Sequence, residues 1–158
     1  MAVAWKFRAS DRADAHWMSE LRAEVMRHDL ERLGRYDQVR VRRRFLDAFV
    51  PAHTRVIVAD GLDVGLVAVR PESDALWLEH FYLAPSYQGR GIGRDVLAHV
   101  LRECDGVRPF RLNVLQGSAA RRLYERHGFT LDHEDPVDVY LMAGPAEVER
   151  HSDSGTGA

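Results

Sequence analysis

The sequence predicts a mixed α/β domain with a central, mostly antiparallel sheet of about seven strands and four helices. Short segments with strand periodicity recur along the chain, and three of them follow one another between residues 53 and 83. Four longer segments carry apolar residues at helical spacing. A length of 158 residues, with 46% hydrophobic and 29% charged residues, suits one domain with a real core.

The first part of the chain reads as a strand followed by two helices. Residues 3–8 alternate apolar and charged side chains, which is the period of a half-buried strand. Asp11 can cap a helix that runs to about residue 30. Asp37 can cap a second helix, which must end before Pro51 because the residue preceding a proline disfavours the α conformation.

The rest of the chain predicts a meander and two strand–helix units. The meander strands are expected at 53–59, 64–70 and 75–83. A helix to about residue 103, a strand at 110–115, a helix capped by Ser118 and two closing strands at 129–133 and 137–142 follow. We expect a single domain over 1–143 and a disordered tail over 144–158, where the residues are small and polar.

Composition excludes several classes of function. The net charge of −2 gives no global indication of a nucleic-acid or membrane partner. Lys6 is the only lysine, which rules out a Walker-type phosphate loop with its Gly-Lys pair. The single cysteine, Cys104, suits a reducing compartment, and no apolar run or leader pattern is present, so we expect a cytoplasmic protein. The histidines show no spacing typical of a metal site.

The most informative stretch is a glycine-rich turn, 88–94, between an apolar strand and an amphipathic helix. The first turn of a helix leaves backbone N–H groups without partners, and the helix dipole adds partial positive charge there. Glycines let a ligand approach the backbone closely. Arg90 and Arg94 add positive charge, so the stretch predicts a phosphate-binding site.

Two other interpretations of this turn are weaker. A dinucleotide site needs G-x-G-x-x-G in the first βαβ unit, whereas this chain has Gly89-x-Gly91-x-Gly93 after a meander. A turn that only connects a strand to a helix would not need Gln88 and the flanking arginines.

The residues 88–93, Gln-Gly-Arg-Gly-Ile-Gly, resemble the Q/R-x-x-G-x-G/A signature of the GNAT N-acetyltransferase superfamily. A second block is similar to the other motif of that family, a strand, a helix with a tyrosine and a Gly-Phe pair, and it contains Leu112-Asn113-Val114, Leu123-Tyr124 and Gly128-Phe129. The order of elements matches the family from about residue 3 to 143. One departure is Gly117-Ser118, where many members carry an asparagine.

The resemblance implies acetyl-CoA as the cofactor and a GNAT-like sheet that splays at the cofactor site. The pantetheine would pair with the exposed edge of the strand before the turn, and the pyrophosphate would sit on the amides of the turn. The residues expected to bind the cofactor are Phe81, Tyr82, Leu83, Gln88, Gly89, Arg90, Gly91, Ile92, Gly93, Arg94, Ser118 and Tyr124.

The resemblance also implies catalytic roles. Tyr124 occupies the position of the usual general acid of the family, and Glu79 lies where many members carry an acidic residue. His80 would face away from the side that Glu79 faces if the strand is regular. Asn113 stands where other members place a base, and it can orient water or substrate instead.

The expected reaction is direct attack of a primary amine on acetyl-CoA in a ternary complex. Acceptor specificity in this family lies mostly in the first two helices, so Arg32, Arg35 and Tyr36 are candidate contacts for an anionic, amino-acid-like small-molecule amine. A protein or peptide amine as acceptor, and a non-catalytic acyl-CoA-binding or regulatory module, remain alternatives. The resemblance also makes a homodimer plausible.

Overall fold

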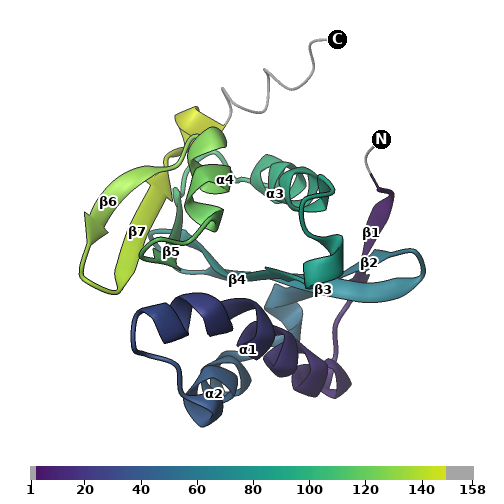
Figure 1. Ribbon diagram of the computed structural model, residues 1–158. Helices are drawn as coiled ribbons and strands as arrows, with labels where there is room; N and C mark the ends of the chain where they lie inside the picture. The colour runs from purple at the N-terminus through teal and green to yellow at the C-terminus, as the bar shows by residue number, and fades with distance from the viewer. Residues whose placement is uncertain (1–2, 149–158) are drawn as a thin grey trace. The chain divides into compact units, whose positions relative to one another are not determined.

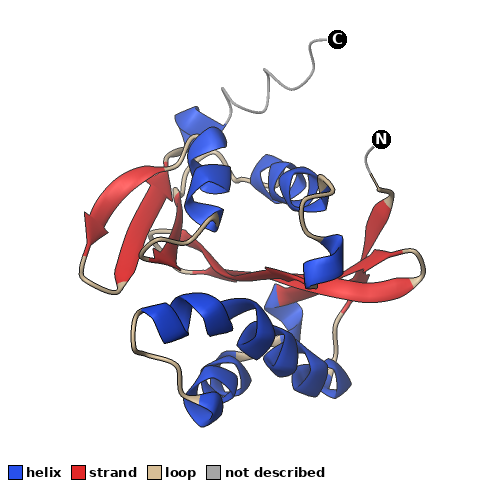
Figure 2. Ribbon diagram, in the orientation of Figure 1, coloured by secondary structure: helices blue, strands red, loops and turns tan. Residues whose placement is uncertain are grey.

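The computed structural model describes residues 3–148. Figure 1 shows the order of the elements along the chain, and Figure 2 separates helices from strands. The helices are α1 (Ala15–Arg32), α2 (Gln38–Ala48), α3 (Ile92–Arg102) and α4 (Ala120–Arg126). The strands are β1 (Trp5–Ala9), β2 (Thr54–Ala59), β3 (Leu62–Pro71), β4 (Leu76–Leu83), β5 (Phe110–Leu115), β6 (Thr130–Glu134) and β7 (Asp138–Ala143). Short 3-10 turns cover Arg12–Asp14, Pro51–His53 and Pro85–Tyr87.

The seven strands pair in the order β1-β2-β3-β4-β5-β7-β6. The pairs β1–β2, β2–β3, β5–β7 and β6–β7 are antiparallel, whereas β4 and β5 are parallel and pair at Leu76–Phe110 and Trp77–Arg111. This topology confirms the predicted mixed, mostly antiparallel sheet with flanking helices. The expected splay at the cofactor site stays a prediction.

Contacts divide the described chain into two compact units. The first contains residues 3–69 and 79–93, and the second contains 70–78 and 94–148. Strand β4 therefore contributes its beginning to the second unit and its end to the first. None of the helices within 3–148 is long and apolar enough to span a membrane.

The core of the first unit forms where α1 and α2 pack on the strands. Met18 and Leu21 of α1, Phe45 of α2 and Leu66 of β3 belong to one buried cluster, and Tyr82 of β4 packs against it. The Asp37 carboxylate caps α2 by accepting hydrogen bonds from the N–H groups of the second and third helical residues, as the sequence predicts.

The second unit has its own core. Burial alternates along β5 and β7, so that each strand buries one face. The fully buried side chains include Phe110, Leu112 and Leu141 from these strands and Leu97 from α3. Tyr124 of α4 is also buried, and its ring meets that of Phe129 edge to face, with centroids 5.6 Å apart.

The predicted elements exist, and their ends differ by a few residues. The strand expected at 3–8 spans Trp5–Ala9, and the helix capped by Asp11 begins as a 3-10 turn and continues to Arg32. The residue that caps α4 is Ala119, while Ser118 Oγ accepts a hydrogen bond from the Ala120 N–H. Within the expected tail, 145–148 are helical and Val148 is buried; 149–158 lie outside the described residues.

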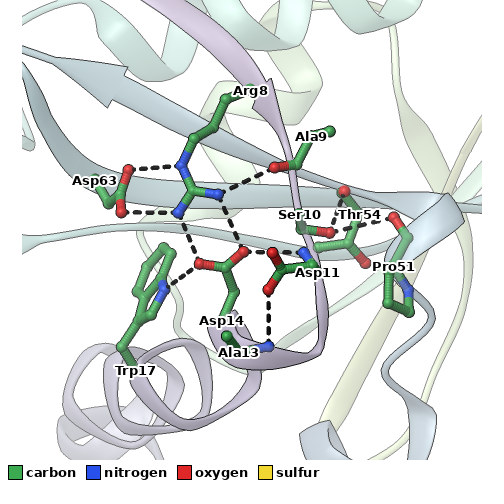
Figure 3. Close-up of polar contacts among 10 residues, drawn as sticks. All are labelled: Arg8, Ala9, Ser10, Asp11, Ala13, Asp14, Trp17, Pro51, Thr54 and Asp63. Atoms are coloured by element: carbon green, nitrogen blue, oxygen red, sulfur yellow. Dashed lines mark hydrogen bonds and ion pairs between the residues drawn. The ribbon is translucent and has the colours of Figure 1, made fainter.

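A charged network holds the start of α1 against two strands (Figure 3). The Arg8 guanidinium of β1 donates to both oxygens of Asp14, at 2.7 and 3.1 Å, and to both oxygens of Asp63 on β3. Asp14 also accepts from the indole N–H of Trp17 and from the Asp11 N–H. Only 6% of Asp14 is exposed, so this carboxylate depends on its donors. The Arg8 hydrogen bonds are the main reason that its pKa lies well below the usual range.

We predict that Asp14→Asn lowers the free energy of unfolding at pH 7 by about 2 kcal/mol, because it leaves buried donors with a weaker acceptor. Folding lowers the pKa of Asp14, so its stabilisation is complete above the unfolded pKa of about 4 and is lost as the pH falls further. Urea unfolding between pH 3 and 7 should therefore show the two proteins converging at low pH. Asp63→Asn, at the more exposed partner of Arg8, is the matched control and should cost less.

Candidate functional site

The end of β4, the glycine-rich turn and the first turn of α3 form one continuous segment. Gly89 and Gly91 have φ angles of 71° and 85°, a left-handed conformation that favours glycine. Gln88, Gly89 and Arg90 are exposed, whereas the Ile92 side chain is fully buried. The backbone of the turn thus lies at the surface just before the N-terminus of α3, which is the arrangement that binds a phosphate.

Side chains brace this turn from within the first unit. Tyr87 Oη donates to Asp60 in the β2–β3 hairpin at 3.1 Å, and the Arg90 guanidinium lies over the Tyr87 ring, 5.0 Å from its centroid. Gln88 Nε2 donates to the Leu83 carbonyl at 2.9 Å. Arg90 is therefore held at the turn, and Gln88 occupies one backbone acceptor at the end of β4.

Gly65 of β3 lets β4 approach closely. A Cβ atom on Gly65 would collide with the Tyr82 carbonyl oxygen and would lie 2.9 Å from Leu83 Cδ2. The two strands stay together past this point, because the Ala84 N–H donates to the Val64 carbonyl at 2.8 Å. The position of Tyr82 and Leu83 thus depends on having glycine, which has no side chain, at position 65 of β3.

The remaining residues predicted to bind the cofactor, together with Asn113, lie in the second unit. Arg94, in the first turn of α3, donates to Asp95 and is largely exposed. Asn113 is exposed on β5, and its Nδ2 donates to Asp138 of β7 at 3.0 Å. Ser118 is half-buried at the start of α4, and Tyr124 is buried in the same helix. The structure thus groups Asn113, Ser118 and Tyr124 in one unit and residues 79–93 in the other.

A buried polar cluster lies beneath the end of β4. His80 packs on the Phe45 ring of α2, and its Nδ1 lies 3.0 Å from Tyr82 Oη. Arg22 of α1 donates from Nε to Tyr82 Oη at 3.1 Å and from Nη1 to the Val41 carbonyl of α2. Burial, and then the charge of Arg22, lower the pKa of His80 to about 3, so His80 is neutral at pH 7 and is not the group that takes a proton from an amine.

Burial raises the pKa of Tyr82, and Arg22 acts against this rise through its charge and its hydrogen bond. The charge of half-buried Glu79 adds a smaller rise. Glu79 and Arg22 therefore both lie within electrostatic reach of Tyr82. The roles predicted for Glu79 as base and Tyr124 as acid stay predictions.

The predicted acceptor contacts lie at the end of α1 and in the loop that follows it. Arg32 pairs with Asp29 at 3.0 Å, and Arg35 is exposed. Tyr36 is half-buried, and the guanidinium of Arg27 lies over its ring. Their contact with an acceptor stays a prediction.

Sequence reasoning missed Arg22, Asp60 and Asp138, which lie beside predicted residues. Arg22 and Tyr82 are separated by sixty positions, and no local pattern distinguishes Arg22 from the other arginines of the first two helices. From the sequence, Asp60 is only part of a hairpin turn. Its partner Tyr87 lies directly before the glycine-rich turn and is the one local signal of this brace.

Comparison with known proteins shows the family of the chain. The model of the acetyltransferase (GNAT) domain matches residues 52–131, slightly more than half of the chain. The chain therefore belongs to the GNAT acetyltransferase family, as the two motifs predicted, and the expected enzyme class, an N-acetyltransferase, agrees with this family. Among curated proteins, no sequence matches significantly.

Solved structures share the fold at low sequence identity. The PaiA N-acetyltransferase of Thermoplasma acidophilum, solved with coenzyme A, has 19% identity and a TM-score of 0.71 over 89% of this chain and 99% of that one. An acetyltransferase from Thermus thermophilus has 19% identity and a TM-score of 0.69 over 90% and 98%. Naa50 of Arabidopsis thaliana, solved with the bisubstrate analogue CoA-Ac-MVNAL, has 20% identity and a TM-score of 0.62 over 89% and 97%.

We predict that Gly65→Ala lowers the free energy of unfolding by about 2–3 kcal/mol, because the new methyl group meets backbone atoms that no rotamer change can move. Gly89→Ala is the matched control. This substitution adds a methyl group in open space, so only the positive φ angle at position 89 disfavours it, and the expected loss of unfolding free energy is about 1 kcal/mol. Urea denaturation of both variants measures the difference. Equal losses of unfolding free energy in the two variants would show that the backbone of β4 shifts at Tyr82 and makes room for the methyl group.

Proposed function

We propose that this protein transfers an acetyl group from acetyl-CoA to a primary amine by direct attack in a ternary complex. The observation that carries the proposal is the exposed turn at 88–90, with left-handed glycines at 89 and 91 directly before α3, in a chain of the GNAT family. The pyrophosphate would bind the amides of this turn, and the pantetheine would pair with the edge at Phe81–Leu83.

The relatives support the choice of donor. Coenzyme A is bound by the PaiA protein of Thermoplasma acidophilum, and a CoA-linked peptide analogue is bound by the plant Naa50 protein. Acetyl-CoA is the donor that we propose for this chain. If the pantetheine pairs with the strand edge, Gln88 has to release the Leu83 carbonyl or share it with the ligand.

The chemistry requires a base, an oxyanion donor and an acid. An alkyl ammonium with a pKa of about 10.4 costs roughly 4–5 kcal/mol to deprotonate at pH 7. We assign the removal of this proton to Glu79, directly or through water. The backbone N–H of Tyr82 or Leu83 would stabilise the oxyanion, and Tyr124 would give a proton to the leaving thiolate.

The direct test is thiol release from acetyl-CoA over a panel of free amino acids, polyamines, aminoglycosides and peptides, with mass detection of the acetylated product. Turnover with a free amino acid or small amine supports the proposal, and turnover with peptides alone favours a peptide acceptor. Tight coenzyme A binding without turnover of any amine would favour a non-catalytic acyl-CoA-binding module.

We predict that Tyr124→Phe lowers kcat about 100-fold with the best amine of this panel, because the leaving thiolate loses its proton donor. The affinity for coenzyme A, measured by calorimetry, should change by less than about threefold. A thermal unfolding scan checks that the buried ring still packs on Phe129. An unchanged kcat would show that Tyr124 is not the proton donor to the leaving thiolate.

We predict that Glu79→Gln also lowers kcat by about 100-fold, because the amide cannot accept the proton of the amine. The loss should shrink for an acceptor of low pKa, such as an acyl hydrazide or an aniline, which is already neutral at pH 7. Steady-state rates with amines of graded pKa measure this trend. A loss that is the same for all of these amines would contradict the role as base.

A further inference from the structure

Arg22 differs from the other arginines of the first unit because it is buried without a carboxylate. Only 8% of Arg22 is exposed, and its recorded hydrogen bonds go to two neutral oxygens, Tyr82 Oη and the Val41 carbonyl. In the described part of the chain no ion pair is recorded for it. A cation taken out of water without an anion destabilises the fold, so this charge calls for an anionic partner.

Three other arginines of the same two helices have such partners. Arg27 pairs with Glu31, Arg32 with Asp29 and Arg42 with Glu20. These ion pairs are more exposed than Arg22, and each is complete within the chain. Within residues 3–148, the remaining arginines of α2 have no recorded ion pair but are exposed to water, so Arg22 combines burial with the lack of a carboxylate.

The cluster around Arg22 also has more donors than acceptors. Tyr82 Oη accepts from Arg22 Nε, and no acceptor other than His80 Nδ1 is recorded for its own proton, so neutral His80 carries its proton on Nε2. That Nε2 is buried and unpaired. Arg22 Nη2 makes no recorded hydrogen bond and is not among the buried unpaired atoms of residues 3–148, so it keeps contact with solvent.

The negative charge nearby belongs to Glu79, which acts on Tyr82 from the same unit. Glu79 alternates with His80 and Tyr82 along β4, so its side chain belongs to the other face of the strand from the Arg22 cluster and does not neutralise the guanidinium directly. An acceptor that carries a carboxylate besides its reacting amine would supply the anion that Arg22 lacks. One guanidinium matches a single carboxylate rather than a doubly charged phosphate monoester.

We propose that Arg22, with Tyr82, forms the carboxylate subsite of the acceptor, so that the substrate is an amino-acid-like amine with a free carboxylate. This inference rests on the proposed N-acetyltransfer and names the acceptor class for it. Arg22 Nη2 donates to the acceptor carboxylate, while Tyr82 Oη and the Val41 carbonyl hold the guanidinium in place. The loop residue Arg35 lies outside this cluster.

The experiment compares each free α-amino acid with its α-carboxamide, which keeps the amine and loses the negative charge. Because the amide also lowers the pKa of the amine, each kcat/KM is divided by the fraction of neutral amine at the assay pH. For the wild-type protein, kcat/KM should favour the acid by about 10- to 100-fold for the best side chain. In Arg22→Met this ratio should fall to about one, mainly through a higher KM for the acid, with the amide within about threefold of wild type. Arg22→Lys should restore part of the ratio, because it keeps the charge.

Arg42→Met is the matched control, since Arg42 also joins α1 to α2 and its ion pair with Glu20 is complete. It should leave the ratio of acid to amide unchanged. Equal losses of kcat/KM for acid and amide in Arg22→Met would show that Arg22 only supports the structure, and this would overturn the proposal. A wild-type ratio near one would overturn it as well, even if Arg22→Met does not fold.

Calorimetry with coenzyme A present separates this inference from the proposed function. Binding of the free amino acids to the wild-type protein, with binding to Arg22→Met weaker by about tenfold or more, would support the carboxylate subsite even without turnover. If amides are acetylated and free acids neither bind nor react, N-acetyltransfer stands and the subsite is wrong.

Discussion

The close contact between β3 and the end of β4 is the constraint on which the candidate site depends. Because Gly65 has no side chain, the Tyr82 carbonyl and Leu83 can lie directly against β3. This contact fixes the point from which the chain enters the glycine-rich turn. The hydrogen bond from the Ala84 N–H to the Val64 carbonyl continues the contact between the two segments just beyond the end of β4. The positive φ angles of Gly89 and Gly91 then lead the backbone into α3. One glycine that allows a close approach and two that adopt positive φ angles thus define one strand–turn–helix segment.

The sequence predicted the features that have local causes. The cap at Asp37, the strand Phe110–Leu115 and the glycine-rich turn all follow from short patterns, and the structure contains them. Strand and helix ends shifted by a few residues because termini depend on tertiary contacts as much as on propensity. The start of α1 is an example, since Asp14 is fixed there by Arg8 and Trp17.

Long-range polar contacts could not be predicted in the same way. Arg8 meets Asp63 across 55 positions, and Arg22 meets Tyr82 across 60. The chain is rich in arginine, so composition and helical spacing alone do not tell a buried guanidinium from a solvated one. Burial makes the distinction, because an arginine inside the protein must find acceptors, while one at the surface can rely on water. Arg35, a predicted acceptor contact in the loop after α1, is exposed to water, whereas Arg22 is buried and depends on acceptors within the protein.

The networks described above rely on guanidinium groups, and this has a chemical consequence. A guanidinium stays protonated at any pH at which the protein is folded, so it has no free lone pair with which to attack a thioester. A lysine can lose its proton and become a nucleophile. Lys6, exposed on β1, is the only lysine side chain of the chain. A protein of this composition can work beside a reactive acyl thioester while the cations that hold its helices and strands together remain chemically inert toward it.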